Sequence, residues 1–518
     1  MSRIKLLDCT LRDGGHINDG HFGKDIIKSI IRDLVKAKID IIEAGFLWDN
    51  ETDEDTARFD SIAKLKRYLP EDMGTSKISL MADNVDLKKL EPNDGTVDII
   101  RLSFRKNEFD WAEKTIDILK DKGYKYYINT IHGSSFTDHE YLQIIERVNK
   151  LKPAGFSIVD TFGAMRQEDL GRIYYLVEKN LEENITLGIH LHENLGQAFS
   201  LAKYVLGIVA PTRQITIDGS LFGMGKVPGN LCIEQMMDYM NHRYKASYSI
   251  EPVYDAIDEF IMPIRQRVSW GYSIPYAISG QCGVHRTYAE YLCGKERLRT
   301  KDIHRLIKSI DKEHSEIFNR EYIESIYLRY MGAEYDDKRS ITALEDAIAP
   351  YQDIIIIAPG SSINDYNFNS NFVEDACSIS VNFVNKTLKT KYAFFTNPKR
   401  LGFSTSLDGT NVIITSNLAD EVAAADYIVS RNELAHHGTL YCDDSTLMLL
   451  NLMKRLGKRR IFLAGFDGLQ KGKTNFYSQY LERSIHEDDA DIKLRKRVLK
   501  ESYDDMDITF LTPSLYKT

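Results

Sequence analysis

The stretch LLDCTLRDGGH at residues 6–16 reads as a buried strand that ends in a polar loop. A second stretch, GIHLHEN at residues 188–194, reads as a strand with two histidines two positions apart. Side chains at positions i and i+2 lie on the same face of a strand, so His190 and His192 can reach one point. With the carboxylate of Asp13 they form a ligand set for a divalent metal that leaves coordination positions open. The two stretches therefore predict a metal centre, and a hydrogen-bonded network at a loop rim is the alternative reading.

The first 220 residues alternate between short apolar runs and amphipathic helical patterns. Each helical pattern follows a strand-like run after a short loop, which is the order of a β-then-α unit. Eight such units predict a (β/α)₈ TIM barrel, and an open doubly wound parallel sheet is the structural alternative. The predicted strands are Ile4–Cys9, Ile39–Phe46, Ile78–Ala82, Val97–Phe104, Tyr126–Ile131, Gly155–Thr161, Ile185–His192 and Ile215–Ser220.

Polar residues gather where these predicted strands end. In barrels of this kind the active site lies at the C-terminal edge of the strands, where the βα loops meet. The sequence therefore predicts that the site residues share one rim of the barrel. The candidates in or directly after the strands are Arg12, Asp13, His16, Glu43, Arg101, Asp160, Thr161, His190, His192, Asp218 and Ser220.

The composition is typical of a soluble enzyme with several domains. The chain has 518 residues, of which 43% are hydrophobic, and this length predicts two to four domains. It contains no apolar run of about 18 residues and starts without the apolar segment of a secretory signal, which predicts a cytoplasmic protein. The net charge of −9 offers no basic surface for nucleic acid, and the six scattered cysteines show no CxxC spacing. We expect small-molecule substrates and a homo-oligomer.

The pattern changes twice along the chain. Residues 1–245 carry the barrel pattern, and residues 246–348 read as a charged helical extension. After Ala349-Pro350, the buried-strand run DIIIIA at residues 353–358 begins a further series of strands and helices. Residues 349–518 are therefore predicted to form a Rossmann-like α/β domain with a mostly parallel sheet. Its further predicted elements are an amphipathic helix at Thr446–Leu456 and strands at Tyr392–Thr396, Val412–Thr415, Tyr427–Ser430 and Arg460–Ala464.

The predicted C-terminal domain lacks the GxGxxG motif of NAD-binding folds, which argues against a fused dehydrogenase. Its turn APGSS at residues 358–362 could hold a phosphate with backbone N–H groups, or could be an ordinary strand-to-helix turn. APGSS and the later run RRIFLAGFDG, residues 459–468, loosely resemble Rossmann-type domains of bacterial glycosyltransferases. That resemblance implies a nucleotide or nucleotide-sugar ligand and a role in polysaccharide biosynthesis.

Several polar residues near the predicted metal site have two readings each. Arg12 could form a structural salt bridge, or its donors could hold a carboxylate or a developing enolate oxygen. His16 could be a solvated loop residue or a general base, since its ordinary pKa is about 6.5. Asn194 is a candidate for orienting a ligand, whereas Asp160 and Thr161 could cap a helix or contact substrate.

Five motifs together resemble the DRE-TIM metallolyase superfamily, which includes 3-hydroxy-3-methylglutaryl-CoA lyase, isopropylmalate synthase and the 4-hydroxy-2-oxovalerate aldolases. The motifs are LLDCTLRDGGH, IEAGF, DTFGAM, HLHENLG and GSLFGMGKVPGN, and the resemblance covers about residues 1–290. The loop TLRDGGH is closer to the TLRDGxH of the pyruvate aldolases than to the TLRDGEQ of the Claisen-type synthases. The resemblance implies metal ligation by Asp13, His190 and His192, an enolate stabiliser Arg12, a base His16, and Thr161 near the keto-acid carboxylate.

One segment departs from the pattern of those aldolases. They carry a segment like GYAGVYSSF that supplies a tyrosine to the site, whereas this chain has GQCGVHRTY at residues 280–288. Gln281 and His285 stand where the tyrosines would be, so His285 becomes a candidate catalytic residue. We expect the aldehyde side of the pocket to have changed.

The sequence thus predicts an aldolase, dependent on Mn²⁺ or Mg²⁺, that forms or cleaves the carbon–carbon bond between a pyruvate enolate and an aldehyde, with a sugar-like aldehyde as the candidate acceptor. The metal would act as a Lewis acid and stabilise the enolate. Two alternatives stay open. The first is an acyl-CoA Claisen-type lyase or synthase of the same superfamily, and the second is a non-catalytic barrel that supports a nucleotide-sugar-binding C-terminal domain.

Overall fold

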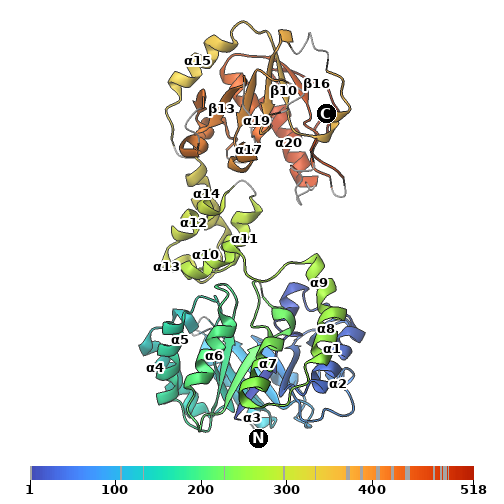
Figure 1. Ribbon diagram of the computed structural model, residues 1–518, viewed down its shortest axis with the longest axis vertical. Coiled ribbons are helices and arrows are strands. Elements are labelled where there is room, and N and C mark those ends of the chain that lie inside the picture. The colour runs from blue at the N-terminus through green and yellow to red at the C-terminus, as the bar shows by residue number, and fades with distance from the viewer. Residues whose placement is uncertain are drawn as a thin grey trace. The chain divides into compact units, whose positions relative to one another are not determined.

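The computed structural model divides the chain into two compact units (Figure 1). Unit 1 comprises residues 1–291 and 307–318, and unit 2 comprises residues 292–306 and 319–518. The division of the chain into three domains therefore stays a prediction. The structure describes residues 3–105, 108–131, 133–226, 228–295, 298–332, 334–368, 374–384, 389–403, 409–421, 425–437, 444–470, 473–478, 481, 487 and 489–517.

Unit 1 is built on a closed parallel barrel, which confirms the predicted fold and excludes the open sheet. Each of its eight strands pairs in parallel with the next, and β1 pairs with both β2 and β9 to close the ring. A two-residue strand, β3, lies beside β2. The predicted and observed strand ends differ by at most two residues. The strands are β1 (Ile4–Asp8), β2 (Ile41–Leu47), β3 (Arg58–Phe59), β4 (Lys77–Asp83), β5 (Ile99–Phe104), β6 (Lys125–Thr130), β7 (Gly155–Asp160), β8 (Thr186–Leu191) and β9 (Ile215–Gly219).

Amphipathic helices cover the outside of the barrel. Helix α1 buries Ile27, Ile30, Ile31 and Leu34, whose spacing places them on one helical face. Figure 1 shows α4, α5 and α6 on one side of the strands and α1, α2 and α8 on the other. The helices are α1 (Lys24–Lys36), α2 (Ile62–Lys66), α3 (Phe109–Asp121), α4 (Asp138–Leu151), α5 (Gln167–Asn180), α6 (Ala198–Ile208), α7 (Ile233–Tyr244), α8 (Glu251–Ala256) and α9 (Met262–Arg267).

The chain after the barrel is helical, as predicted, and part of it returns to unit 1. The backbone N–H of His285 donates to the carbonyl of Ser315 at 2.7 Å, and the hydroxyl of Tyr288 donates to the carbonyl of His314 at 2.7 Å. These bonds fasten residues 312–318 over the loop that contains His285. The helices are α10 (Ile274–Cys282), α11 (Thr287–Gly294), α12 (Thr300–Lys308), α13 (Lys312–Ser315), α14 (Arg320–Met331) and α15 (Lys338–Ile348).

Unit 2 contains a parallel sheet of seven strands in the order β14-β13-β12-β11-β10-β15-β16, which confirms an α/β fold. Two of its strands were not predicted: β11 alternates serine with apolar residues, and β16 is a short, partly exposed edge strand. The strands are β10 (Asp353–Ile357), β11 (Cys377–Val381), β12 (Tyr392–Phe395), β13 (Asn411–Thr415), β14 (Tyr427–Val429), β15 (Arg460–Ala464) and β16 (Asp507–Phe510). The helices are α17 (Pro398–Phe403), α18 (Arg431–Leu434), α19 (Ser445–Arg455) and α20 (Asp489–Ser502).

Three statements made from the sequence can be compared with the described residues. Among them, no helix has the length and apolar character that a membrane span requires. The five cysteines within the described ranges are free thiols, and Cys442 lies outside those ranges. The predicted helix Thr446–Leu456 is α19, shifted by one residue.

Candidate metal centre

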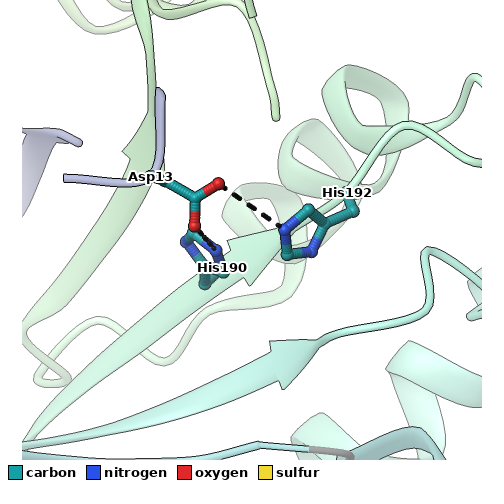
Figure 2. Close-up of side chains that lie close together, drawn as sticks. All are labelled: Asp13, His190 and His192. Carbon is teal, nitrogen blue, oxygen red and sulfur yellow. Dashed lines mark ion pairs between the residues drawn. The ribbon is translucent and has the colours of Figure 1, made fainter. Parts of the chain in front are cut away.

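The three predicted metal ligands meet at the C-terminal mouth of the barrel (Figure 2). Asp13 follows β1, His190 lies in β8, and His192 comes directly after β8; all three are buried. One possible ligand atom from each lies within 4.8 Å of the others. Asp13 Oδ2 is 3.6 Å from His190 Nε2, and Asp13 Oδ1 is 4.0 Å from His192 Nε2. These separations exceed hydrogen-bond length and leave room for an ion between the three groups.

The outer nitrogens of both histidines are held by other groups. His190 Nδ1 lies 3.1 Å from Asp218 Oδ2, and His192 Nδ1 lies 2.9 Å from the carbonyl oxygen of Asp160. A carbonyl can only accept, so His192 Nδ1 carries the proton and its Nε2 keeps a lone pair. That Nε2 atom is buried and has no hydrogen-bond partner among the described residues. An unpaired buried nitrogen is costly, and a metal ion would satisfy it, so this ligand set fits a divalent metal.

Asp13 is held in its ionised form. Burial acts to raise the pKa of Asp13, but the adjacent Arg12 guanidinium and the two histidines outweigh it and hold this pKa well below its ordinary value. Its Oδ1 also accepts the backbone N–H of Lys226 at 2.9 Å and the side-chain amide of Asn230 at 3.1 Å. The carboxylate is therefore oriented as well as charged.

A closed ring of buried polar contacts links the metal ligands to Arg12. Arg12 pairs with Asp13 and donates from Nε to Glu43 at 2.6 Å. Arg101 donates to Glu43 at 3.2 Å and to Asp218 at 2.5 Å, and Asp218 faces His190. We call this set the buried charge ring: Arg12, Asp13, Glu43, Arg101, Asp218 and His190. No member is more than 6% exposed, so each charge depends on its neighbours in the ring for compensation.

A cavity of about 360 Å³ opens above the three ligands. His16 lies at this cavity with its ring against Phe46, at 5.6 Å between centroids, and it remains exposed to solvent. His285, in the loop that is hydrogen-bonded to Ser315, also lines the cavity. The candidates that line the cavity together are Arg12, Asp13, His16, Arg101, Thr161, His190, His192 and His285.

Other candidates lie away from the cavity wall. The Asp160 carboxylate accepts the backbone N–H groups of Ala164 and Met165, each at 3.0 Å, so it closes the turn after β7. Burial raises the pKa of Asp160 to about 6. Asn194 is buried and donates to the carbonyl of Tyr276 at 3.4 Å. The remaining residues outside the lining are Glu43, Asp218, Ser220 and Gln281.

Sequence reasoning missed several residues that line the cavity. Asp83 ends β4 and Arg105 follows β5, so the rule that placed the other candidates at strand ends could have found both. Lys226 lies in the quoted motif GSLFGMGKVPGN, yet it was not singled out. Glu316 and Phe318 come from the helical extension, where no sequence signal marks them.

Replacing Asp218 by asparagine should weaken metal binding by about 10- to 100-fold, because Asp218 orients His190 from behind. Titration of the purified chain with Mn²⁺, followed by electron paramagnetic resonance, measures this affinity. Asp238→Asn, an exposed carboxylate on α7, is the matched control and should bind Mn²⁺ like the wild type. An unchanged affinity in folded Asp218→Asn would show that Asp218 has no part in orienting the ligand.

Comparison with known proteins agrees with this geometry. Residues 3–258 match the family model HMGL-like. A 4-hydroxy-2-oxovalerate aldolase of Geobacillus genomosp. 3 is 24% identical over an alignment of 282 residues that covers 49% of this chain and 78% of the aldolase. A 2-isopropylmalate synthase of Methylacidiphilum infernorum is 26% identical over an alignment of 265 residues that covers 48% of this chain and 51% of the synthase. The chain thus spans about half the length of this synthase.

Among solved structures, the HMG-CoA lyase of Brucella melitensis aligns with 51% of this chain and with 100% of its own, at 15% identity and a TM-score of 0.39. Family model, relatives and motifs agree over the region that carries the barrel and its three buried ligands. Residues 3–258 therefore form an HMGL-like domain, which supports the resemblance of this part of the chain to the DRE-TIM metallolyase superfamily.

Proposed function

We propose that unit 1 is a divalent-metal-dependent aldolase that forms or cleaves a carbon–carbon bond between a pyruvate enolate and an aldehyde. One observation carries this proposal: Arg12 lies beside the three metal ligands Asp13, His190 and His192, and all four residues line the same cavity as His16. A buried cation beside a set of metal ligands is the arrangement that stabilises negative charge on an enolate oxygen. The aldolase relative, of which the chain spans 78%, supports this reaction class.

In the cleavage direction, His16 would accept the proton of the substrate hydroxyl on a ring nitrogen. The hydroxyl carbon becomes the aldehyde carbonyl, the carbon–carbon bond breaks, and its electron pair passes to the enolate, which takes up a proton to give pyruvate. Arg12 would hold the enolate oxygen, and Thr161 would contact the keto-acid carboxylate. Asp13, His190 and His192 would hold Mn²⁺ or Mg²⁺, which supplies Lewis-acid polarisation of the keto acid.

The charged side chains that line the cavity favour an acceptor rich in hydroxyl groups, such as a sugar-like aldehyde. Asp83, Arg105, Lys226 and Glu316 place charges of both signs around the cavity. A short alkyl aldehyde has no groups to pair with these side chains, whereas the hydroxyls of a sugar can both donate and accept. His285 would contact the acceptor from the same side, in the place of the aldolase tyrosine.

The first test is proton exchange at the methyl group of pyruvate, followed by NMR in deuterated water. We expect exchange with Mn²⁺ and its loss on addition of EDTA, because enolate formation removes a methyl proton. Absence of exchange under both conditions would contradict the aldolase. Release of free thiol from acetyl-CoA in the presence of a keto acid would favour the Claisen-type reaction, which the synthase relative supports.

We also propose a cellular location, an oligomeric state and a ligand of unit 2 for this protein. The chain would act in the cytoplasm as a homo-oligomer on small molecules, and unit 2 would bind a nucleotide or nucleotide-sugar in the biosynthesis of a polysaccharide. If unit 2 bound such a ligand while the barrel showed neither exchange nor thiol release, the barrel would be a scaffold.

A further inference from the structure

Lys226 brings a positive charge to the barrel cavity that has no role in the reaction proposed above. The residue lies in the motif GSLFGMGKVPGN after β9, and it lines the cavity of about 360 Å³ that contains the metal ligands. Its backbone N–H donates to Asp13 Oδ1 at 2.9 Å, which fixes the backbone of Lys226 beside the metal site. The side chain is not needed for that bond, so its ammonium group is available for another purpose.

The ammonium group of Lys226 has no bonded partner in the part of the chain that the structure describes. Lys226 is partly buried, and the interactions that act on it there are those of more distant charges. An ammonium group has three donors and no acceptor. A donor that loses water without gaining an acceptor is costly, and an anionic group of a ligand would supply the missing acceptors.

The two arginines whose charges act on Lys226 each have a glutamate of their own. Arg286 pairs with Glu290, and Arg105 pairs with Glu108 at 3.3 Å. Within the described ranges Lys226 has no such carboxylate. An anion that enters the cavity therefore gains most by pairing with Lys226.

The carboxylates that line the cavity do not neutralise Lys226. Asp13 pairs with Arg12 and belongs to the metal site. Asp83 and Glu316 also line the cavity, but among the described contacts neither forms an ion pair with Lys226, and Asp83 acts on it only through its distant charge. A ligand can therefore bridge the two groups, with an anionic group on Lys226 and a hydroxyl donor on Asp83.

The position of Lys226 assigns this anion to the acceptor rather than to the keto acid. The proposed base His16 takes its proton from the hydroxyl that becomes the aldehyde oxygen, so groups near His16 lie on the acceptor side. The charge of Lys226 acts on His16 and on Asp83. Thr161, the proposed contact of the keto-acid carboxylate, follows β7, which β8 separates from the strand that precedes Lys226.

We propose that Lys226 selects an acceptor aldehyde that carries an anionic group, a phosphate or a carboxylate, and that Asp83 accepts a hydroxyl of the same molecule. The inference rests on the aldolase function proposed above and names the class of its acceptor. The cavity lies at the lower end of the range of about 300–1,000 Å³ that ligand pockets occupy. It therefore suits a small acceptor, such as a phosphorylated triose or tetrose, beside the keto acid.

The test compares two pairs of aldehydes as acceptors for pyruvate, with the full chain and Mn²⁺. The pairs are glyceraldehyde with glyceraldehyde 3-phosphate, and butanal with succinic semialdehyde; the second member of each pair is an anion. Product formation, followed by NMR, gives kcat/KM. We expect a preference of about 10-fold or more for the anionic member of at least one pair. Preference in the first pair alone would identify a phosphate, and preference in the second alone would identify a carboxylate.

Lys226→Met removes the charge and keeps the backbone N–H that holds Asp13. It should lower kcat/KM for the preferred anionic aldehyde by about 10-fold or more, and that for the neutral member of the pair far less, because only the anion loses a charge-assisted contact. Lys226→Arg keeps the charge and should keep the preference. Lys179→Met, which changes an exposed lysine of α5, is the matched control and should react like the wild type.

The wild-type comparison needs no variant, so the proposal stays testable if Lys226→Met does not fold. Equal reaction with both members of both pairs, or no reaction with any of the four, would overturn it. A rise in the KM for pyruvate in Lys226→Met, as large as the loss with the anionic aldehyde, would place the keto-acid carboxylate on Lys226 and overturn it as well. Exchange of pyruvate protons without an acceptor separates the two proposals. Its absence contradicts the aldolase and this inference together, whereas exchange without preference for an anion contradicts this inference alone.

Discussion

Replacing His192 by alanine should abolish metal-dependent exchange of pyruvate protons and weaken Mn²⁺ binding by at least 100-fold. His192 supplies one of three ligand atoms, and its Nε2 is the buried nitrogen that has no other partner in the described structure. Two remaining ligands hold a divalent ion much less well than three. Electron paramagnetic resonance of Mn²⁺ gives the affinity, and NMR gives the exchange rate.

Two controls separate this effect from a general loss of structure. His242→Ala removes an exposed histidine of α7 and should leave both measurements unchanged. The melting temperature without metal should change little in His192→Ala, because the variant removes an unsatisfied polar atom as well as packing. Wild-type Mn²⁺ affinity in folded His192→Ala would refute the assignment of this ligand.

Replacing Arg12 by lysine should lower the exchange rate by about 100- to 1,000-fold, the usual cost of removing one donor to a developing oxyanion. Lysine keeps the positive charge, but it lacks the planar fork with which Arg12 contacts Asp13 and Glu43 together. We expect Mn²⁺ affinity to fall less than 10-fold, since all three ligands remain. The expected result is therefore a slow enzyme that still binds metal.

The matched control for this variant is Arg67→Lys, which changes an exposed arginine that pairs with Glu54 on the same unit. It should exchange pyruvate protons at the wild-type rate. An Arg12→Lys variant that exchanged at the wild-type rate would show that another group stabilises the enolate. A parallel loss of Mn²⁺ binding would instead assign Arg12 to the support of Asp13.

Periodicity and local motifs predicted the barrel because most strands of unit 1 are rich in apolar residues, as β2 and β7 show, and a parallel sheet covered by helices requires this pattern. The three metal ligands could be predicted for a similar reason: position along a strand fixes which side chains share a face. Strand β11 could not be predicted in this way, because its serines at 378 and 380 interrupt the apolar run although both are fully buried.

Contacts between segments that are far apart in the sequence could not be predicted from local sequence patterns. The bonds from His285 and Tyr288 to residues 312–318 bring Glu316 and Phe318 to the cavity, and no local signal reports such a pairing. The bond between Ser362 and Asp467 likewise joins residues 105 positions apart. From the sequence, the turn APGSS could be either a phosphate site or an ordinary turn, because only the folded chain shows that the N–H of Ser362 faces Asp467.

The buried charge ring also has an electrical consequence for the order of binding. Its two guanidiniums pair with three carboxylate groups, and these charges leave one net negative charge when His190 is neutral. A divalent ion turns this into one net positive charge, and a keto-acid monoanion then brings the interior to neutrality. A buried charge without compensation is costly. We therefore expect the metal to bind first, because its binding leaves the net positive charge that the keto-acid anion then neutralises.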